Sequence, residues 1–301
     1  MYCIETKDLS YRYSTTDSVL SGANLRVPEQ SIYGFLGANG AGKTTTMRLL
    51  LGLLEKQSGD ILILGEQPDK DRIRMLRKIG SLIEYPSFYA HLSASENLEV
   101  LNKIYQSPHS SLQRALEITG LGKTGSKPVG KFSLGMKQRL GIASSLVHEP
   151  SLLILDEPTN GLDPNGIIEI RDLFLSLNRQ EGISIFISSH LLSEIELVAT
   201  DVGIIHEGKL LFQDSIERMQ EKAQKQITFM TSNPIKTQEI LKRLDSSSKI
   251  IDQKVISGHL SNTHVAEINR ILVNNDIEVY QIVADKENFE QTFMDIINNI
   301  S

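Results

Sequence analysis

Eight consecutive residues, Gly37 to Thr44, have the types and spacing needed to hold a chain of phosphate groups. They lie between an apolar run that ends at Leu36 and a helix-like stretch that begins at Thr45. The glycines allow a tight loop whose backbone N–H groups point at phosphate oxygens, and the helix N-terminus adds a favourable dipole. A plain glycine-rich turn is the alternative, but the complete strand, loop and helix context disfavours it. The stretch therefore predicts a nucleoside triphosphate site.

Two side chains of this loop carry chemistry beyond that of the glycines. The amine of Lys43 would reach the outer phosphates as a point charge, and the hydroxyl of Thr44 would bind Mg²⁺. The residues expected to contact the nucleotide here are Gly37, Asn39, Gly40, Gly42, Lys43, Thr44 and Thr45.

A carboxylate pair, Asp156 and Glu157, directly follows a buried strand expected at 151–155. In open α/β sheets, ligands bind at the carboxyl ends of such strands. Asp156 can hold Mg²⁺ through water, and Glu157 can orient or deprotonate an attacking water molecule. An apolar run followed by Asp-Glu is common by chance, so its weight comes from the phosphate loop before it.

His190 follows the next expected buried strand, at 183–187. A lone histidine is usually a surface residue or a satisfied core residue. Here its strand is expected to run parallel to that of Asp156, so one edge of the sheet would present both side chains. We therefore count His190 among the catalytic candidates, with Lys43 and Glu157.

Two further positions are ambiguous when taken alone. Ser133 precedes a helix as a plausible N-cap, so its hydroxyl and the following N–H groups could form a second anion site, although a plain capped helix is the simpler explanation. Tyr13 could be a stacking platform for a purine base, but a half-buried aromatic residue of a strand is the more common case.

Short strands must position these side chains, and the pattern places them at 2–9, 19–27, 31–36, 59–65 and 79–83. From Ser93, which opens a helix in capping-box style, to about Pro150 the pattern is helical. This stretch is interpreted as a helical insertion in an α/β core. A hairpin is expected around Glu207-Gly208.

From about Asp214 the character of the sequence changes. A charged helical connector is expected over 217–225, followed by a small α+β module whose last helix spans Phe289 to Ile297. The module contains no cluster of residues that can be assigned to chemistry.

Composition describes an ordinary soluble globular protein, with 301 residues of which 40% are hydrophobic and 23% charged. The net charge of −6 argues against a nucleic-acid surface spread over the whole molecule. The single cysteine, Cys3, excludes an intrachain disulfide framework. Neither a signal peptide nor an apolar run of about 18 residues is found, so no direct membrane insertion is expected.

In combination, residues 1 to about 215 resemble the ATP-binding cassette (ABC) ATPases. The motifs that carry the resemblance are the Walker A loop at Gly37–Thr44, the Walker B strand at 152–156 with Glu157 as the catalytic carboxylate, the signature at Ser133–Gln138, the D-loop at Asn160–Asp163, the switch histidine His190 and the A-loop aromatic Tyr13.

The resemblance implies an α/β fold, a P-loop NTPase core whose mixed sheet has helices on both faces. The nucleotide-binding domain would span 1–215, with an ABC-type helical subdomain at about 84–150, and a small C-terminal α+β domain would span 216–301. The implied reaction is hydrolysis of ATP with Mg²⁺ as cofactor.

Two departures from the family pattern stand out. Leu134 and Met136 replace a glycine-type and the glutamine-type position of the signature, while Ser133 and Gly135, the groups expected at the phosphate, remain. Glu84 stands where the family normally has the Q-loop glutamine. A carboxylate there can still bind Mg²⁺, so the implied metal ligands are Thr44, Glu84 and Asp156.

The family mechanism implies two partners. A second cassette, identical or different, would pack head to tail, so that ATP lies between the phosphate loop of one subunit and Ser133 and Gly135 of the other, with Asp163 also at the nucleotide. A membrane permease would receive the motion through the loop from Glu84 to Phe88. The chain would then be cytoplasmic and peripheral on the inner face of the membrane, with no nucleic-acid partner.

The loop from Ile79 to Tyr89 and the C-terminal extension resemble the subgroup linked to bacitracin and lantibiotic self-protection, in which a Glu at this place is usual. That resemblance implies clearance of a peptide antibiotic. A transporter for another substrate class, a soluble ATP-driven switch and a binding-only regulatory subunit are the alternatives. The intact Glu157 and His190 oppose the last of these.

Overall fold

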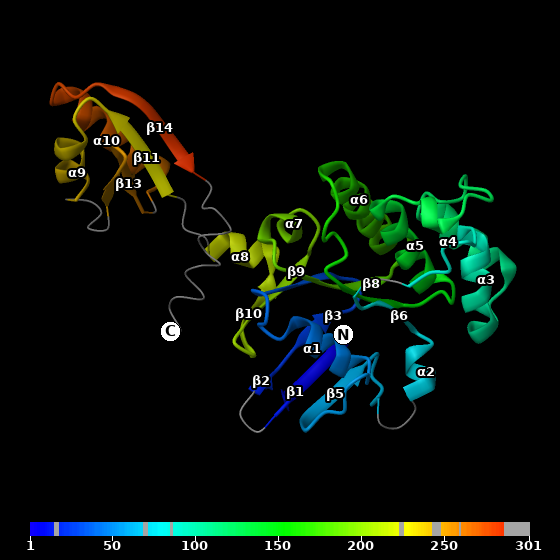
Figure 1. Cartoon of the computed structure of the whole chain (residues 1–301). Coiled ribbons are helices and arrows are strands. Elements are labelled where there is room, and N and C mark those ends of the chain that lie inside the picture. Colours follow the sequence, from blue (N-terminus) through cyan, green and yellow to red (C-terminus); the bar gives the residue numbers. More distant parts are fainter. Residues whose placement is uncertain are drawn as a thin grey trace. The chain divides into compact units, whose positions relative to one another are not determined.

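The computed structural model describes residues 1–14, 18–68, 72–84, 87–222, 226–242, 248–258 and 260–285 (Figure 1). The chain forms two compact units, of which the first spans Met1–Ile216 and the second begins at Glu217.

A six-stranded sheet forms the centre of the first unit and carries the predicted motifs. Its order is β10 (Lys209–Ser215), β9 (Asp201–His206), β4 (Ile32–Leu36), β8 (Ser184–Ser189), β7 (Leu152–Asp156) and β6 (Ile79–Leu82). The strands from β9 to β6 are parallel, and β10 alone pairs in the antiparallel sense. The predicted α/β class with a mixed sheet is confirmed. Every residue of β4 is buried, as is usual for a central parallel strand.

A second, antiparallel sheet is built around β1 (Tyr2–Arg12), which pairs with β2 (Ser18–Ala23), β3 (Arg26–Pro28) and β5 (Ser58–Ile63). The prediction of one strand over 19–27 was therefore wrong. The chain breaks at Asn24 and Leu25 because the N–H of Leu25 binds the hydroxyl of Thr6 at 2.8 Å and the N–H of Thr6 binds the carbonyl of Leu25 at 2.9 Å. This exchange lets the two short strands pair with opposite ends of β1.

Helix α1 (Lys43–Leu50) follows the phosphate loop and joins the two sheets into one core. Its buried Met47, Leu49 and Leu50 belong to the same apolar cluster as Leu9 of β1 and Phe186 of β8. The start of α1 is thereby fixed against the edge at which β4, β7 and β8 end.

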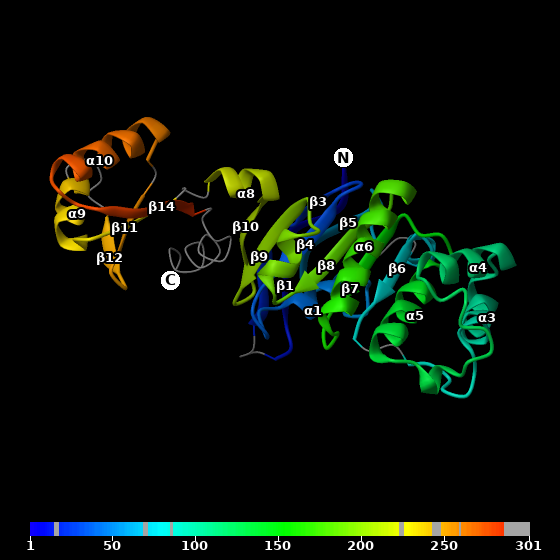
Figure 2. The same ribbon diagram turned by 90° about the horizontal axis from the view of Figure 1, so that it is seen from above.

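The predicted helical stretch contains α3 (Ala94–Tyr105), α4 (His109–Ile118), the 3₁₀ turn η1 (Val129–Lys131) and α5 (Leu134–Leu146). Figures 1 and 2 show α3, α4 and α5 grouped beside β6. Ser93 caps α3 in a capping box with Glu96, as the sequence predicts. The remaining helices of this unit are α2 (Arg72–Leu76), α6 (Pro164–Glu181) and α7 (Leu192–Glu196), and α8 (Ile216–Lys222) spans the boundary.

The described part of the second unit forms an antiparallel sheet packed with helices, and its own core includes Phe229, Leu241 and Ile268. The strand order is β12 (Lys249–Ile251), β13 (Lys254–Ser257), β11 (Gln226–Thr231) and β14 (Val279–Asp285), and the helices are α9 (Pro234–Leu241) and α10 (Asn262–Asn274). The helix predicted over Phe289 to Ile297 lies outside the described residues. None of the described helices combines the length and the apolar character needed to span a membrane.

Candidate nucleotide and catalytic site

The phosphate loop joins the end of β4 to the start of α1, and at Gly37 and Gly42 its backbone has room for glycine only. Gly42, the N-cap of α1, has φ of 108°, and a Cβ there would lie 2.8 Å from the carbonyl oxygen of Val19. At Gly37 a Cβ would lie 2.5 Å from the carbonyl oxygen of Ile205. No side chain caps the first turn of α1, so its N–H groups are available to an anion. The loop is therefore a cradle suited to phosphate oxygens.

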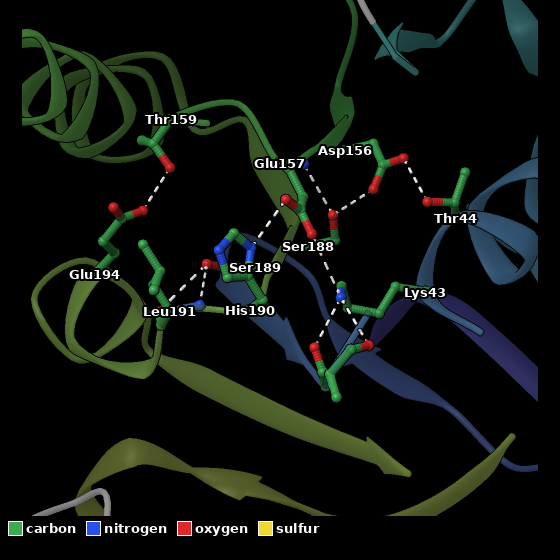
Figure 3. A network of polar contacts seen from close by, with 12 residues as sticks. Lys43, Thr44, Asp156, Glu157, Thr159, Ser188, Ser189, His190, Leu191 and Glu194 are labelled. Carbon is green, nitrogen blue, oxygen red and sulfur yellow. Dashed lines mark hydrogen bonds and ion pairs between the residues drawn. The ribbon is translucent and has the colours of Figure 1, made fainter. Parts of the chain in front are cut away.

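Lys43 is buried, with 5% of its side chain exposed, and its amine turns back over this loop. Figure 3 shows the Nζ between two backbone carbonyls and a carboxylate. It donates to the carbonyl oxygens of Gly37 at 2.7 Å and Ala38 at 3.2 Å, and lies 3.4 Å from Oε1 of Glu157. The amine is thus held where it can exchange these partners for phosphate oxygens.

Thr44 and Asp156 meet across 112 residues of sequence, since the hydroxyl of Thr44 donates to Oδ2 of Asp156 at 2.7 Å. A hydroxyl and a carboxylate are hard oxygen donors of the kind that Mg²⁺ prefers, and this ion usually takes its other ligands from water and substrate phosphates. No group of three or more His, Cys, Asp or Glu side chains suited to a metal occurs in the described part of the chain. The residues present therefore fit a Mg²⁺ ion that arrives with a nucleotide.

Glu157 lies between the lysine and the predicted histidine. Its Oε2 is 2.9 Å from Nδ1 of His190, and its side chain is 21% exposed (Figure 3). The parallel register of β7 and β8 pairs Asp156 with Ser188, so the prediction that one sheet edge presents both Asp156 and His190 is confirmed. A carboxylate held by a histidine and reached by solvent is a geometry suited to accepting a proton from water.

Ser188, which the sequence did not single out, contacts both carboxylate residues. Its hydroxyl donates to Oδ1 of Asp156 and accepts from the backbone N–H of Glu157 at 2.9 Å. Its place at the end of the strand before His190 was visible in the sequence. The register that brings it to Asp156 was not, because it depends on pairing between distant segments. A second link, also missed, joins Thr159 to Glu194 of α7 by a hydrogen bond.

Tyr13 and Glu84 both meet Arg48, a residue of α1. The hydroxyl of Tyr13 lies 3.4 Å from that of Thr45, and its ring is half exposed. Arg48 forms an ion pair with Glu84, whose side chain is 62% exposed. Burial alone would lower the pKa of Arg48, but its hydrogen bond to Tyr13 and the charge of Glu84 outweigh burial and raise it.

The predicted metal contact of Glu84 stays a prediction. In the part of the chain that is described, no hydrogen bond joins Glu84 to Thr44 or Asp156, and its carboxylate binds Arg48 instead.

The signature residues lie on a different element from the phosphate loop. Ser133 caps α5 and accepts from the N–H of Met136 at 3.2 Å, and Asp163 caps α6 by accepting from Gly166 at 3.2 Å. Among the described residues, no hydrogen bond or ion pair links Ser133 or Gly135 to the phosphate loop, and both views show α5 apart from α1 (Figures 1 and 2). The two predicted anion sites of one chain are thus separate.

A cavity of about 470 Å³, lined by apolar and polar side chains, lies between the end of β6, α3 and α5. Its lining includes Ile83, Phe88, Val100, Ile104, Tyr105 and His148. Val100 and Ile104 are 37% and 71% exposed, so this apolar surface is open to solvent.

The profile of the family described as ABC transporter matches residues 20–160. The bacitracin transport ATP-binding protein BcrA of Bacillus licheniformis is 46% identical over 98% of this chain and 97% of its own length. The lantibiotic transport ATP-binding protein SrtF of Streptococcus pyogenes is also 46% identical, over 70% of this chain and 92% of its own length. Among solved structures, CbiO1 of Clostridium perfringens, described as part of the ABC transporter complex CbiONQ, superposes with a TM-score of 0.67 at 30% identity, covering 72% of this chain and 90% of that one.

Proposed function

Because the chain belongs to the ATPase subunits of ABC transporters, we propose that it uses ATP to drive a separate membrane permease that clears a bacitracin-like peptide antibiotic. The observation that carries the substrate class is the extent of the match to the bacitracin transport protein. That match covers 98% of this chain, whereas the match to the lantibiotic protein covers 70%. The similarity to the bacitracin protein therefore extends well beyond the length of the cassette.

The proposed chemistry follows from the contacts at the sheet edge. The γ-phosphate would replace the carbonyl and carboxylate partners of Lys43. Because the amine of Lys43 is buried, its attraction to the phosphate would be strong. Glu157 would accept a proton from the attacking water, and His190 would orient Glu157 and contact the γ-phosphate. Mg²⁺ held by Thr44 and Asp156 would neutralise charge on the phosphate oxygens.

Two copies of the site would work together in a pair of cassettes, identical or different. Support comes from the separation of Ser133 and Gly135 from the phosphate loop of their own chain. A head-to-tail partner would bring the N-terminus of its α5 to the γ-phosphate, where the helix dipole favours the anion. Asp163, at the start of α6, would also lie at the nucleotide.

The cavity beside α3, with the exposed apolar side chains of Val100 and Ile104, is the proposed contact for the permease, which would place the chain on the cytoplasmic face of the membrane. Replacing the exposed Ile104 by Glu should abolish copurification with the permease while leaving the ATPase activity of the free subunit unchanged. The matched control is Ile73→Glu, because Ile73 is 74% exposed on α2 and does not line the cavity. Equal permease binding by the two variants would contradict the proposed surface.

The substrate is tested by deleting the gene and measuring the inhibitory concentrations of bacitracin and of a nisin-type lantibiotic. We expect deletion to lower the tolerated bacitracin concentration, and wild type but not Glu157→Gln to restore it. A selective change in lantibiotic tolerance would reassign the substrate. No change with either drug, together with failure to copurify any polytopic membrane protein, would favour the soluble switch.

A further inference from the structure

We infer that Ser188 is a positioning residue of the ATPase reaction, which fixes the Mg²⁺-binding carboxylate of Asp156 and the backbone of the catalytic Glu157 relative to each other. The inference rests on the roles proposed above for these two residues. It assigns to Ser188 a function that the motifs of the chain do not include.

The register of the sheet brings Ser188 to Asp156. In the parallel pairing of β7 and β8 the two residues are direct partners, and side chains at paired positions point to the same face. Ser188 is completely buried, with no exposed surface. Water therefore cannot reach this position and take over the hydrogen bonds of the Ser188 hydroxyl.

Both hydrogen-bonding functions of the Ser188 hydroxyl are used on the catalytic residues. The O–H donates to Oδ1 of Asp156, and the oxygen accepts from the N–H of Glu157 at 2.9 Å (Figure 3). Since the hydroxyl has one donor, no other residue can receive it at the same time. One side chain thereby links the strand end to the residue after it.

The link matters for Asp156 because its other oxygen, Oδ2, faces Thr44 at 2.7 Å. The Thr44 hydroxyl would bind a metal ion through its oxygen and could still donate to Oδ2, while the bond from Ser188 to Oδ1 would fix the carboxylate plane from the other side. Groups that hold a metal ligand from behind commonly change metal affinity by about 10- to 100-fold when they are removed.

The link also matters for Glu157, whose φ of 44° lies in the left-handed region that non-glycine residues rarely adopt. Such a backbone persists only where surrounding bonds hold it, and its N–H is bound by Ser188. Release of this bond would let Glu157 relax and move its carboxylate away from Lys43 and His190.

The test compares Ser188→Ala with Ser184→Ala. Ser184 lies at the opposite end of the same strand, is 4% exposed, and accepts one hydrogen bond, from the N–H of Gln30 at 2.8 Å. Each variant removes one buried hydroxyl from the same strand. Only the first contacts Asp156 and Glu157.

Three quantities are measured on the purified full chain: kcat, the Mg²⁺ concentration for half-maximal rate, and the ratio of dissociation constants for a non-hydrolysable ATP analogue with and without Mg²⁺. For Ser188→Ala we expect kcat to fall at least tenfold, the Mg²⁺ requirement to rise about tenfold, and the Mg²⁺-dependent gain in binding to shrink by a similar factor. For Ser184→Ala all three should stay within twofold of wild type. Unchanged values for Ser188→Ala, or equal losses in both variants, would overturn the inference.

Two additional variants keep the result decisive. Ser188→Cys preserves shape with a weak donor, so if the alanine variant fails to fold, the cysteine variant must show the same losses in Mg²⁺ requirement and binding gain. Wild-type values in Ser188→Cys would then refute the inference. Glu157→Gln tests the catalytic role of Glu157 separately from the role of Ser188. Full activity in Glu157→Gln would remove the catalytic role of Glu157. An inactive Glu157→Gln together with normal values for Ser188→Ala would remove only the role of Ser188.

Discussion

Replacing Glu157 by Gln should separate ATP binding from ATP turnover. The change keeps the shape of the side chain and removes one negative charge 3.4 Å from the amine of Lys43. Because the amide cannot accept a proton from water, kcat should fall by about 10²- to 10⁴-fold, the range that general-base catalysis contributes.

The same substitution should tighten ATP binding, and the size of this effect follows from the geometry. Two unit charges at 3.4 Å interact with an energy of about 5 kcal/mol at an effective dielectric constant of about 20, which is an upper bound. Contact with His190 and partial solvent exposure offset most of this energy. We expect about 1 to 2 kcal/mol to remain, which corresponds to roughly 5- to 30-fold tighter binding.

Binding is measured by titration with a fluorescent ATP analogue, and turnover by phosphate release. The control is Glu196→Gln, which removes the same charge from an exposed position of α7 and should leave both quantities unchanged. Turnover within threefold of wild type in Glu157→Gln would refute the assignment of the general base. Weaker ATP binding in that variant would refute the competition between Glu157 and phosphate for Lys43.

Three further predictions concern other parts of the first unit. Gly42→Ala should abolish ATP binding at millimolar concentrations, measured by the same titration, because the added Cβ would lie 2.8 Å from the carbonyl of Val19 at a φ of 108°. Burial lowers the pKa of His148, which stacks on Tyr105 with ring centres 4.1 Å apart, so the unfolded chain binds the proton more readily. The melting temperature should therefore fall as the pH drops below the usual histidine value of 6.5, and His148→Phe should flatten this part of the profile. Burial raises the pKa of the Cys3 thiol to about 11, so a thiol reagent at neutral pH should label Cys3 only at the rate of unfolding, and rapid labelling of the native chain would contradict this packing.

The local motifs of the first unit could be predicted because the residues that carry their chemistry are consecutive in the sequence. The same few residues predict a strand, a turn and a site together, both in the loop from Gly37 to Thr44 and at the carboxylates Asp156 and Glu157. Strand ends of a parallel sheet meet at one edge, so the placing of His190 at the same edge as Asp156 followed from the order of elements.

What could not be predicted depends on pairing between distant segments. The division of 19–27 into β2 and β3 results from an exchange of hydrogen bonds with Thr6, which no local pattern reveals. The role inferred for Ser188 requires the register of β7 against β8, and the pairing of Glu84 with Arg48 requires the packing of α1. Side chains of common type, placed by long-range contacts, carry no distinctive signal in the sequence.

The position of β4 in the central sheet has a consequence for the synthesis of the chain. This strand leads directly into the phosphate loop, yet its two neighbours, β8 and β9, begin about 150 and about 170 residues later, at Ser184 and Asp201. While the ribosome is still making the helical insertion, β4 is an apolar strand with both edges unpaired, a state prone to aggregation. The nucleotide site therefore closes only when the chain has emerged past His206, so ATP can stabilise a nascent cassette only near the end of the synthesis of its first unit.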